Sequence, residues 1–378
     1  MLIENNSIHD TKGTAPQSGI DLEGGFGENG HRNSNVTIKG NKFYNNAAYD
    51  IILYDGRDAI VEDNHLASKG VIGLAVSEPF TGATVKNNHF DGTRIFATHD
   101  VTFINNKMND SYTTFSGPNI KIDGMTFTDS LFAINAKDDF GISVSNVTMH
   151  NTKKSESGLT VWGKPVHIKN LTITGESTLR SVTGGAAEGS IFDNLKVIGY
   201  NTTYGLSLPP GTYNNCVFEG AEGGEYGAIG IEQAGKYVFN GCSFKSSKTS
   251  KVNVQANHPK LDLTIKHSTF ELLGNAQAIN IQAARSVLLE KNTISANNLT
   301  IDGIELIRLS DVWKSKDKKQ IAKVVIRGNT ITANRPAIGI STVNAGAGAP
   351  SFTIEENTLN NAKISSKKND AVKNNSIK

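Results

Sequence analysis

The sequence predicts an all-β chain, wound as a single-stranded right-handed parallel β-helix of about sixteen coils with an asparagine ladder at one corner. The first indication is a repeat of an alternating apolar segment, then Asn, a polar residue and an apolar residue, as in Thr37-Ile38-Lys39-Gly40-Asn41-Lys42-Phe43. The second is its period: Asn41, Asn64 and Asn88 are 23 and 24 residues apart, which suits about three short strands per coil. The third is a Gly-apolar-x-apolar strand that follows the ladder, as in Gly158-Leu159-Thr160-Val161.

The corner residue is predicted to point inward. Asn suits a sharp corner because it tolerates the left-handed backbone region, bonds with the backbone, and can donate its amide to the Asn of the next coil. In the middle of the chain, apolar or small residues take this place, and only a buried site would exchange Asn for Val, Leu and Cys. These residues are Met125, Val147, Leu171, Leu195, Cys216, Cys242 and Ser268.

The two cysteines fall at this corner one coil apart, so their Cα atoms should be about 4.8 Å from each other. A disulfide is geometrically conceivable at that distance. A buried, reduced pair is favoured, because free Cys behaves as a small hydrophobe and both replace small apolar neighbours. Neither Cys216 nor Cys242 is predicted to be a nucleophile or a metal ligand.

Composition and charge exclude several functions. The net charge of +2 is nearly neutral, and the 38 basic residues are spread along the chain, which argues against nucleic acid as the main partner. No long apolar run offers a membrane span, and the first residues do not resemble a signal peptide. The one long interval, 37 residues between Asn292 and Asn329, predicts an inserted loop at about 311–323 within a single domain of residues 1–378.

One outer face is predicted to bind substrate. Alternate residues of the Gly-apolar-x-apolar strands should point outward and stack from coil to coil. Amides, acids and aromatics in a shallow groove suit sugar hydroxyls, although a simple solvated face is the alternative. The predicted substrate-binding residues are Tyr54, Asn135, Trp162, Glu232, Gln255 and Gln282, and Asn253, Asn280 and Glu305 are expected on the same face.

The leading catalytic candidates are three carboxylates in the first coils, Asp21, Glu23 and Asp55. Asp21 and Glu23 are two residues apart on one strand, about 7 Å on one face, and the region of Asp55 should stack beside them. Paired carboxylates can divide the acid and base or nucleophile roles of glycoside cleavage. They can equally bind calcium through oxygen, and the sequence predicts no other metal-ligand residue.

A second catalytic candidate combines Lys137, Asp138, Asp139 and Arg180. Cleavage of a uronate polymer by β-elimination needs a base for the C5 proton and a cation to steady the carboxylate, and Lys or Arg beside Asp can supply both. The alternative is charge pairing between adjacent strands, which is common on any sheet and contributes little.

The Asn-rich coils, together with Gly19-Ile20-Asp21-Leu22-Glu23, resemble the pectin-lyase-like β-helix superfamily, and most of all the polysaccharide-processing β-helices of phage tailspikes and tail appendages. Members are lyases, hydrolases, epimerases or binders of long glycans, and many of the phage proteins are trimers. The Asp ladder and Arg-x-Pro-x-x-Arg region of a true pectate lyase are absent, which argues against pectate. Because fold does not fix function, the resemblance implies carbohydrate without naming a reaction.

The sequence therefore predicts a β-helix that binds and cleaves a cell-surface or extracellular polysaccharide, as a hydrolase or a lyase, in an extracellular or virion-associated protein and with a homotrimer as the expected assembly. The alternative is a non-catalytic adhesin or a structural β-helix of a particle. Both ends of the chain are ordinary ladder segments without a cap, so we expect it to be part of a longer protein or assembly.

Overall fold

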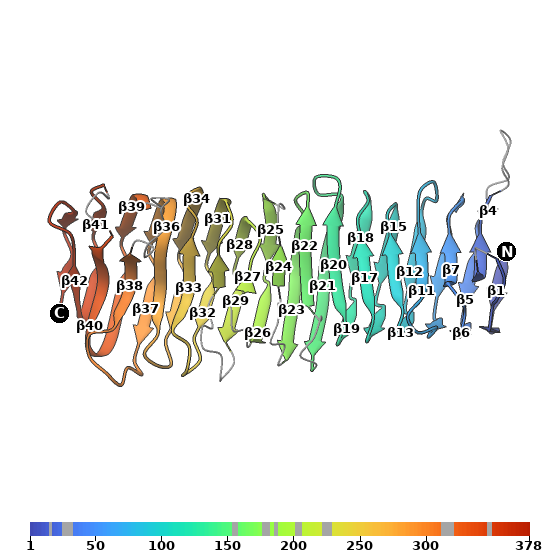
Figure 1. Cartoon of the computed structure of the whole chain (residues 1–378), viewed down its shortest axis with the longest axis horizontal. Coiled ribbons are helices and arrows are strands. Elements are labelled where there is room, and N and C mark those ends of the chain that lie inside the picture. The colour runs from blue at the N-terminus through green and yellow to red at the C-terminus, as the bar shows by residue number, and fades with distance from the viewer. Residues whose placement is uncertain are drawn as a thin grey trace. The chain divides into compact units, whose positions relative to one another are not determined.

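The computed structural model describes residues 1–378 apart from 15–16, 25–32, 153–157, 176–181, 185–187, 201–205, 221–228, 311–320 and 346–349. The chain divides into two compact units, Met1–Ile173 (unit 1) and Thr174–Lys378 (unit 2). Both are built from coils with a strand before the corner residue, a strand after it, and a third strand. Strands of one kind pair in parallel from coil to coil, so each unit is a parallel β-helix (Figure 1).

In unit 1 the three kinds of strand form three columns. The strands before the corner are β1 (Leu2–Glu4), β5 (Thr37–Lys39), β9 (Ile60–Glu62), β12 (Ala83–Lys86), β15 (Val101–Ile104) and β18 (Ile120–Asp123). Those after it are β2 (Ser7–His9), β6 (Lys42–Tyr44), β10 (His65–Leu66), β13 (His89–Asp91), β16 (Lys107–Asn109) and β19 (Thr126–Thr128). The third strands are β3 (Ser18–Leu22), β7 (Tyr49–Leu53), β11 (Ile72–Val76), β14 (Arg94–Ala97), β17 (Tyr112–Phe115), β20 (Leu131–Ala136) and β22 (Gly158–Gly163).

A few strands of unit 1 depart from this scheme. β21 (Ile142–Asn151) runs through the corner, since it pairs with both β18 and β19. β4 (Asn33–Ser34) and β8 (Gly56–Arg57) form a separate two-stranded sheet. β23 (His167–Gly175) contains the boundary between the two units.

Unit 2 repeats the three columns. Before the corner lie β25 (Ser190–Asp193), β28 (Gly211–Asn214), β31 (Gly235–Asn240), β34 (Leu261–Lys266), β39 (Ile321–Arg327), β41 (Thr353–Glu355) and β43 (Ala371–Lys373). After it lie β26 (Lys196–Tyr200), β29 (Val217–Gly220), β32 (Ser243–Lys245), β35 (Thr269–Glu271), β37 (Thr293–Ala296) and β44 (Ser376–Ile377). The third strands are β24 (Val182–Gly184), β27 (Leu206–Ser207), β30 (Ile229–Ile231), β33 (Val252–Asn257) and β38 (Glu305–Ser310), and β36 (Gln277–Glu290), β40 (Thr330–Asn344) and β42 (Thr358–Ser365) each serve two columns.

The core of each unit consists of inward side chains stacked at the same place in successive coils. In unit 2, Phe244 and Phe270 stack with ring centroids 4.6 Å apart, and so do Phe192 and Tyr213. Tyr213 is fully buried, and its hydroxyl donates to the carbonyl of Pro209 at 2.6 Å. Burial raises the pKa of Tyr213 well above its ordinary value. Such stacks provide large apolar burial while the buried hydroxyl keeps its hydrogen bond.

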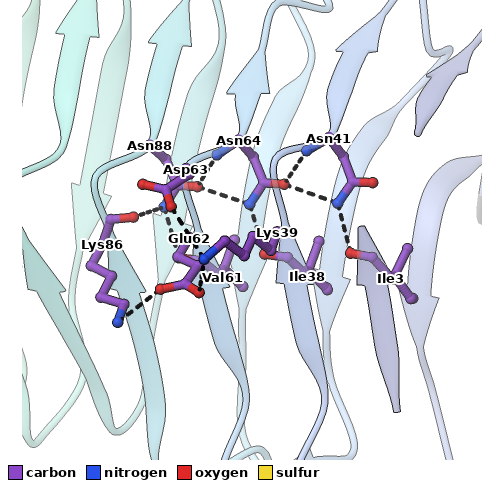
Figure 2. A network of polar contacts seen from close by, with 10 residues as sticks. All are labelled: Ile3, Ile38, Lys39, Asn41, Val61, Glu62, Asp63, Asn64, Lys86 and Asn88. Atoms are coloured by element: carbon purple, nitrogen blue, oxygen red, sulfur yellow. Dashed lines mark hydrogen bonds and ion pairs between the residues drawn. The ribbon is translucent and has the colours of Figure 1, made fainter. Parts of the chain in front are cut away.

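The asparagine ladder is present at the predicted corner (Figure 2). In unit 1, Asn64 Oδ1 accepts from both the backbone nitrogen and Nδ2 of Asn41, at 2.9 and 3.0 Å, and Asn64 Nδ2 donates to Asn88 Oδ1 at 2.9 Å. In unit 2, Asn292 Nδ2 donates to Asn329 Oδ1 at 3.0 Å. These asparagines are buried, as are the apolar residues that replace them, so the prediction of an inward corner is confirmed.

The expected left-handed backbone lies one residue earlier than predicted. Gly40, Asp63 and Asn87 have φ of +63°, +55° and +55°, and each directly precedes a ladder asparagine. The chain turns at this preceding residue, and the ladder residue itself then points inward. Asn is therefore present in the ladder for its hydrogen bonds, and the explanation from left-handed tolerance was wrong for that position.

A second polar corner in unit 1 holds a buried carboxyl group. Asp50 is fully buried, and its Oδ1 accepts from Asn46 Nδ2 at 2.8 Å and from Ser68 Oγ at 2.5 Å. Its Oδ2 has no hydrogen-bond partner among the described residues. Burial raises the pKa of Asp50, and the bonds from Ser68 and Asn46 only partly oppose this.

The two cysteines are free and buried, as the sequence favoured. Cys216 Sγ lies 3.4 Å from the carbonyl oxygen of Phe192, and Cys242 Sγ lies 3.2 Å from that of Tyr213. Burial raises the pKa of the Cys216 thiol. Both thiols thus act as small core side chains that donate weakly to backbone carbonyls.

Candidate functional site

A polar groove lies on the third strands of unit 2. Its volume is about 610 Å³, and β33, β36 and β38 supply most of its walls. We call it the polar groove. The residues that line it are Lys251, Val252, Gln255, Asn275, Gln277, Asn280, Gln282, Gly303, Ile304, Glu305, Arg308 and Ile338.

The strand register brings three of these side chains into one row. Gln255 of β33 pairs with Asn280 of β36, and Asn280 pairs with Arg308 of β38. In-register residues of parallel strands are one strand spacing apart, about 4.8 Å, so an amide, an amide and a guanidinium follow one another along the groove. Asn280 is only 9% exposed, and its Oδ1 has no hydrogen-bond partner among the described residues.

Glu305 and Arg308 form the charged part of the groove. Arg308 Nε lies 3.2 Å from Glu305 Oε2, and Ser341 Oγ donates to Glu305 Oε1 at 2.5 Å. Both side chains are partly covered, so their positions are fixed by each other and by β40. The guanidinium keeps its remaining N–H groups for hydroxyl or carboxylate oxygens.

This chemistry suits the binding of hydroxyl-rich chains more than their cleavage. The amides can both donate and accept, as sugar hydroxyls do, and the aliphatic side chains of Val252, Ile304 and Ile338 offer apolar contact. Glu305 is the single carboxylate among the described lining residues. Glycoside hydrolysis generally uses two carboxyl groups on either side of the bond, so the groove does not by itself supply that pair.

Only some of the predicted binding residues of unit 2 line the groove. Gln255 and Gln282 line the groove, and Gln282 is the extra residue where the register between β33 and β36 shifts. Glu232 follows β30, is exposed and is not among the lining residues. Asn253 and Asn280 were expected to be exposed, and both are buried. Alternation gives the direction of a side chain, but not whether its neighbours cover it.

Sequence reasoning missed Arg308 and Lys251. Arg308 lies three residues after Glu305 in the strand already marked by its Gly-apolar-x-apolar pattern. Residues three apart in a strand should point to opposite faces, so the sequence offered no signal for this pair.

The predicted carboxylates of unit 1 lie at the end of β3. Asp21 is part of that strand and Glu23 follows it as an exposed residue. Asp21 Oδ2 accepts from Ser18 Oγ at 3.1 Å, whereas its Oδ1 is buried and lacks a hydrogen-bond partner among the described residues. Asp21 is in register with Ile52 of β7, so an apolar side chain stacks beside its carboxylate.

Asp55 is held beside the same strand end. Its backbone nitrogen donates to the carbonyl of Leu22 at 2.9 Å. Its carboxylate covers Gly24 so closely that a Cβ there would come within 1.6 Å of Asp55 Oδ2. A side chain at position 24 would therefore require the Asp55 carboxylate to move, and this close approach brings Asp55 to the region of Asp21 and Glu23.

The aromatic residues predicted on this face of unit 1 are exposed. Tyr54 and Trp162 are 46% and 48% exposed, and Asn135 of β20 is in register with Trp162 of β22. Asn135 is exposed too. The amide and the indole therefore lie side by side on the surface, one strand spacing apart.

One residue of the second predicted cluster, Asp139, forms an exposed ion pair with Lys164. Lys164 Nζ lies 3.6 Å from Asp139 Oδ1, with both side chains more than half exposed, and such a pair contributes little to stability. Lys137 and Asp138 are exposed, and Arg180 lies outside the described residues. Most of the predicted insertion at 311–323 also lies outside them, and its residues 321–323 begin β39.

The described residues contain no group of three or more His, Cys, Asp or Glu side chains arranged to hold a metal ion. In the same part of the chain, no helix has the length and apolar character needed to cross a membrane.

Comparison with known families gives one match. The family model described as "Right handed beta helix region" matches residues 1–114, 27–189 and 204–377. These ranges cover most of both units, and they confirm the predicted fold class, including its right-handed winding. No curated protein and no solved structure matches the chain.

Proposed function

The chain belongs to the right-handed β-helix family, and from this premise we propose that it binds an extracellular or cell-surface polysaccharide in the polar groove of unit 2. The observation that carries the proposal is Asn280 Oδ1, a buried acceptor in the groove without a partner among the described residues. A buried unpaired acceptor costs free energy, and a sugar hydroxyl would supply the missing donor. Gln255 and Arg308 lie on either side of it in register and can bind neighbouring hydroxyls.

The charged lining residues favour a glycan with acidic groups. Lys251, Glu305 and Arg308 give the groove one more basic than acidic side chain. A guanidinium recognises a carboxylate or phosphate through paired N–H groups, and here Glu305 already orients it. A neutral polymer would use the amides alone.

Binding can be tested with a polymer panel of polyuronate, teichoic acid and neutral dextran. We expect one acidic polymer to bind, as measured by calorimetry, and Asn280→Ala and Gln255→Ala each to weaken it about tenfold. Such a loss corresponds to about 1.4 kcal/mol, the typical value of one hydrogen bond in a desolvated site.

The matched control is Asn297→Ala, an amide truncation at an exposed residue of unit 2 outside the groove lining. It should leave the affinity unchanged. Equal loss in all three variants, or no binding to any polymer class, would contradict the proposal.

Cleavage is a second candidate function. It is favoured by Asp21 Oδ1, which is buried and has no hydrogen-bond partner among the described residues, and by Asp55, whose backbone nitrogen bonds to the end of β3. Hydrolysis would give new reducing ends, and elimination would give the absorbance of an unsaturated uronate. Asp21→Asn and Glu23→Gln should then reduce turnover by at least a hundredfold. Unchanged turnover in both would remove this carboxylate group from consideration.

A tailspike or other phage tail appendage is the particle context that we propose, with a homotrimer as its assembly and a non-catalytic adhesin as the alternative to an enzyme. Exposed aromatics such as Trp162 and Tyr54 are compatible with contacts to glycan in either case. Sedimentation equilibrium of the purified chain measures the mass directly, and a monomer at all concentrations would reject the trimer.

A further inference from the structure

Unit 1 carries a row of basic side chains on its strands after the corner, away from the third strands. Lys42 of β6 pairs with His65 of β10, His65 with His89 of β13, and His89 with Lys107 of β16. All four side chains are outward and exposed. We call these four residues the basic row.

Four basic side chains follow one another in the row without an acid between them. The rings of His65 and His89 lie 5.0 Å apart and 17° from parallel. None of the four side chains forms an ion pair with any residue that the structure describes. Burial lowers the pKa of His89, with His65 and Lys107 acting in the same direction and Asp91 opposing them. The lysines at its two ends supply positive charge, and the imidazoles between them offer ring N–H groups.

The neighbouring strands show how the same fold pairs its charges. Lys39, Glu62 and Lys86 stand in register before the corner, and Glu62 lies 3.1 Å from Lys39 Nζ and 2.8 Å from Lys86 Nζ (Figure 2). Opposite charges alternate there from coil to coil, so each lysine has a carboxylate partner. The basic row lacks this alternation, and its charges are left for a partner.

The surface beside the row is polar. Two residues further along each strand, Tyr44, Asp91 and Asn109 point outward on the same side, and Asn109 Nδ2 donates to Asp91 Oδ1 at 3.0 Å. One ring face of Tyr44 is covered by His9, with centroids 4.5 Å apart. A phenol hydroxyl, an amide and the Asp91 carboxylate therefore lie beside the basic side chains, and they can pair with the hydroxyl groups of a chain whose acidic groups follow the row.

We propose that the basic row of unit 1 binds a carboxylate-bearing polysaccharide, laid along the stack of coils, at a site separate from the polar groove. The acidic groups of successive sugars neutralise Lys42 and Lys107, and the two imidazoles donate to the oxygens between them. This inference does not rest on the function proposed for the groove, because other strands and other residues supply it.

Polygalacturonate is the probe, and its methyl ester is the uncharged control with the same backbone. Binding is measured in the Gln255→Ala/Asn280→Ala background, so that the groove does not contribute. We expect Lys42→Gln/Lys107→Gln to weaken binding at least tenfold, the ester not to bind, and added salt to weaken binding because exposed charges are screened.

The matched control is Lys69→Gln/Lys121→Gln, which removes two exposed lysines of unit 1 that lie outside the row. It lowers the net charge equally and should leave the affinity unchanged. Equal weakening by the two double variants, equal affinity for the ester, or no binding of polygalacturonate would overturn the proposal. Tighter binding of a single-stranded DNA with the same lysine dependence would also overturn it, in favour of a nucleic-acid surface.

Discussion

Asn64 Oδ1 accepts two hydrogen bonds from Asn41, one from its backbone nitrogen and one from its side-chain amide. The same oxygen therefore satisfies a buried backbone donor of the neighbouring coil and connects the two side chains. Repeated from coil to coil, this arrangement leaves no corner nitrogen of these rungs without an acceptor.

Replacing Asn64 with Leu should destabilise the protein strongly. Leu fits the corner, since Leu171 occupies the same place, but the buried nitrogen of Asn41 would lose its acceptor. Since the hydrogen bond between the two side-chain amides is lost as well, we expect the free energy of unfolding to fall by about 3–5 kcal/mol. Urea unfolding measures this change. The control is Met125→Leu, an exchange of similar volume at an apolar rung, which should lower the free energy of unfolding by less than about 1.5 kcal/mol. Similar costs for both variants would show that the ladder bonds contribute little.

Asp50→Asn should make stability less dependent on pH. The folded pKa of Asp50 is raised by burial, so the folded state keeps its proton where the unfolded chain has lost it. Stability from this group is fully present below the unfolded pKa of about 3.9, falls as pH rises to the folded pKa, and is constant above it. The variant should remove this fall and be more stable at pH 7, by about 1.4 kcal/mol for each unit of pKa shift. Urea midpoints from pH 3 to 8 test it, and Asp63→Asn, at an exposed residue, should keep the dependence.

The titration of His89 should respond to its charged neighbours. Its pKa is lowered by burial, then by His65 and Lys107, while Asp91 raises it. Lys107→Gln should therefore move the NMR titration of His89 to higher pH, and Asp91→Asn should move it lower. Lys121→Gln, on a different column, is the control, and an equal shift there would show that general charge rather than stacking acts on the imidazole.

Tyr213→Phe should lower the free energy of unfolding by about 1–3 kcal/mol, although the ring and its stacking are retained. The buried carbonyl of Pro209 would lose the hydroxyl that donates to it at 2.6 Å. Thermal or urea unfolding measures the loss. Phe239→Tyr would be the reverse change, which places a hydroxyl in the same stack. A Tyr213→Phe variant as stable as the parent would show that water replaces the lost bond.

The two thiols should react with a labelling reagent only when unit 2 unfolds. Both are buried, so the reagent cannot reach either sulfur in the folded protein, and burial also raises the pKa of Cys216. Labelling rates followed across a urea titration should coincide with the loss of β-sheet signal. Fast labelling of the folded chain would contradict the buried pair.

The sequence was sufficient for the features that repeat. The period of the asparagines located the corner, and the exchange of Asn for Val147 or Leu195 showed that it points inward, because only burial explains that exchange. The same alignment indicated that Cys216 and Cys242 are buried and reduced. A repeat averages over many coils, so it reports well on what the coils share.

The features that differ between coils could not be predicted in the same way. The polar groove depends on which outward side chains are covered by their neighbours, as Asn280 is, and on the ion pair of Glu305 with Arg308. Neither follows from alternation. The left-handed residue was misplaced by one position because Asn, Asp and Gly all occur before the ladder and only the backbone distinguishes the two sites.

The ladder tolerates very different lengths of chain between its rungs. Asn88 and Asn106 are 18 residues apart, and Asn292 and Asn329 are 37 apart. In both pairs, however, the side-chain amides are joined by a hydrogen bond of 3.0 Å. Extra residues are accommodated in the connections, and the corner restores the stacking before the next strand begins. Segments foreign to the protein should therefore be graftable into a connection of one coil without disturbing the coils on either side, and natural variants of such a chain can acquire new surface loops at little structural cost.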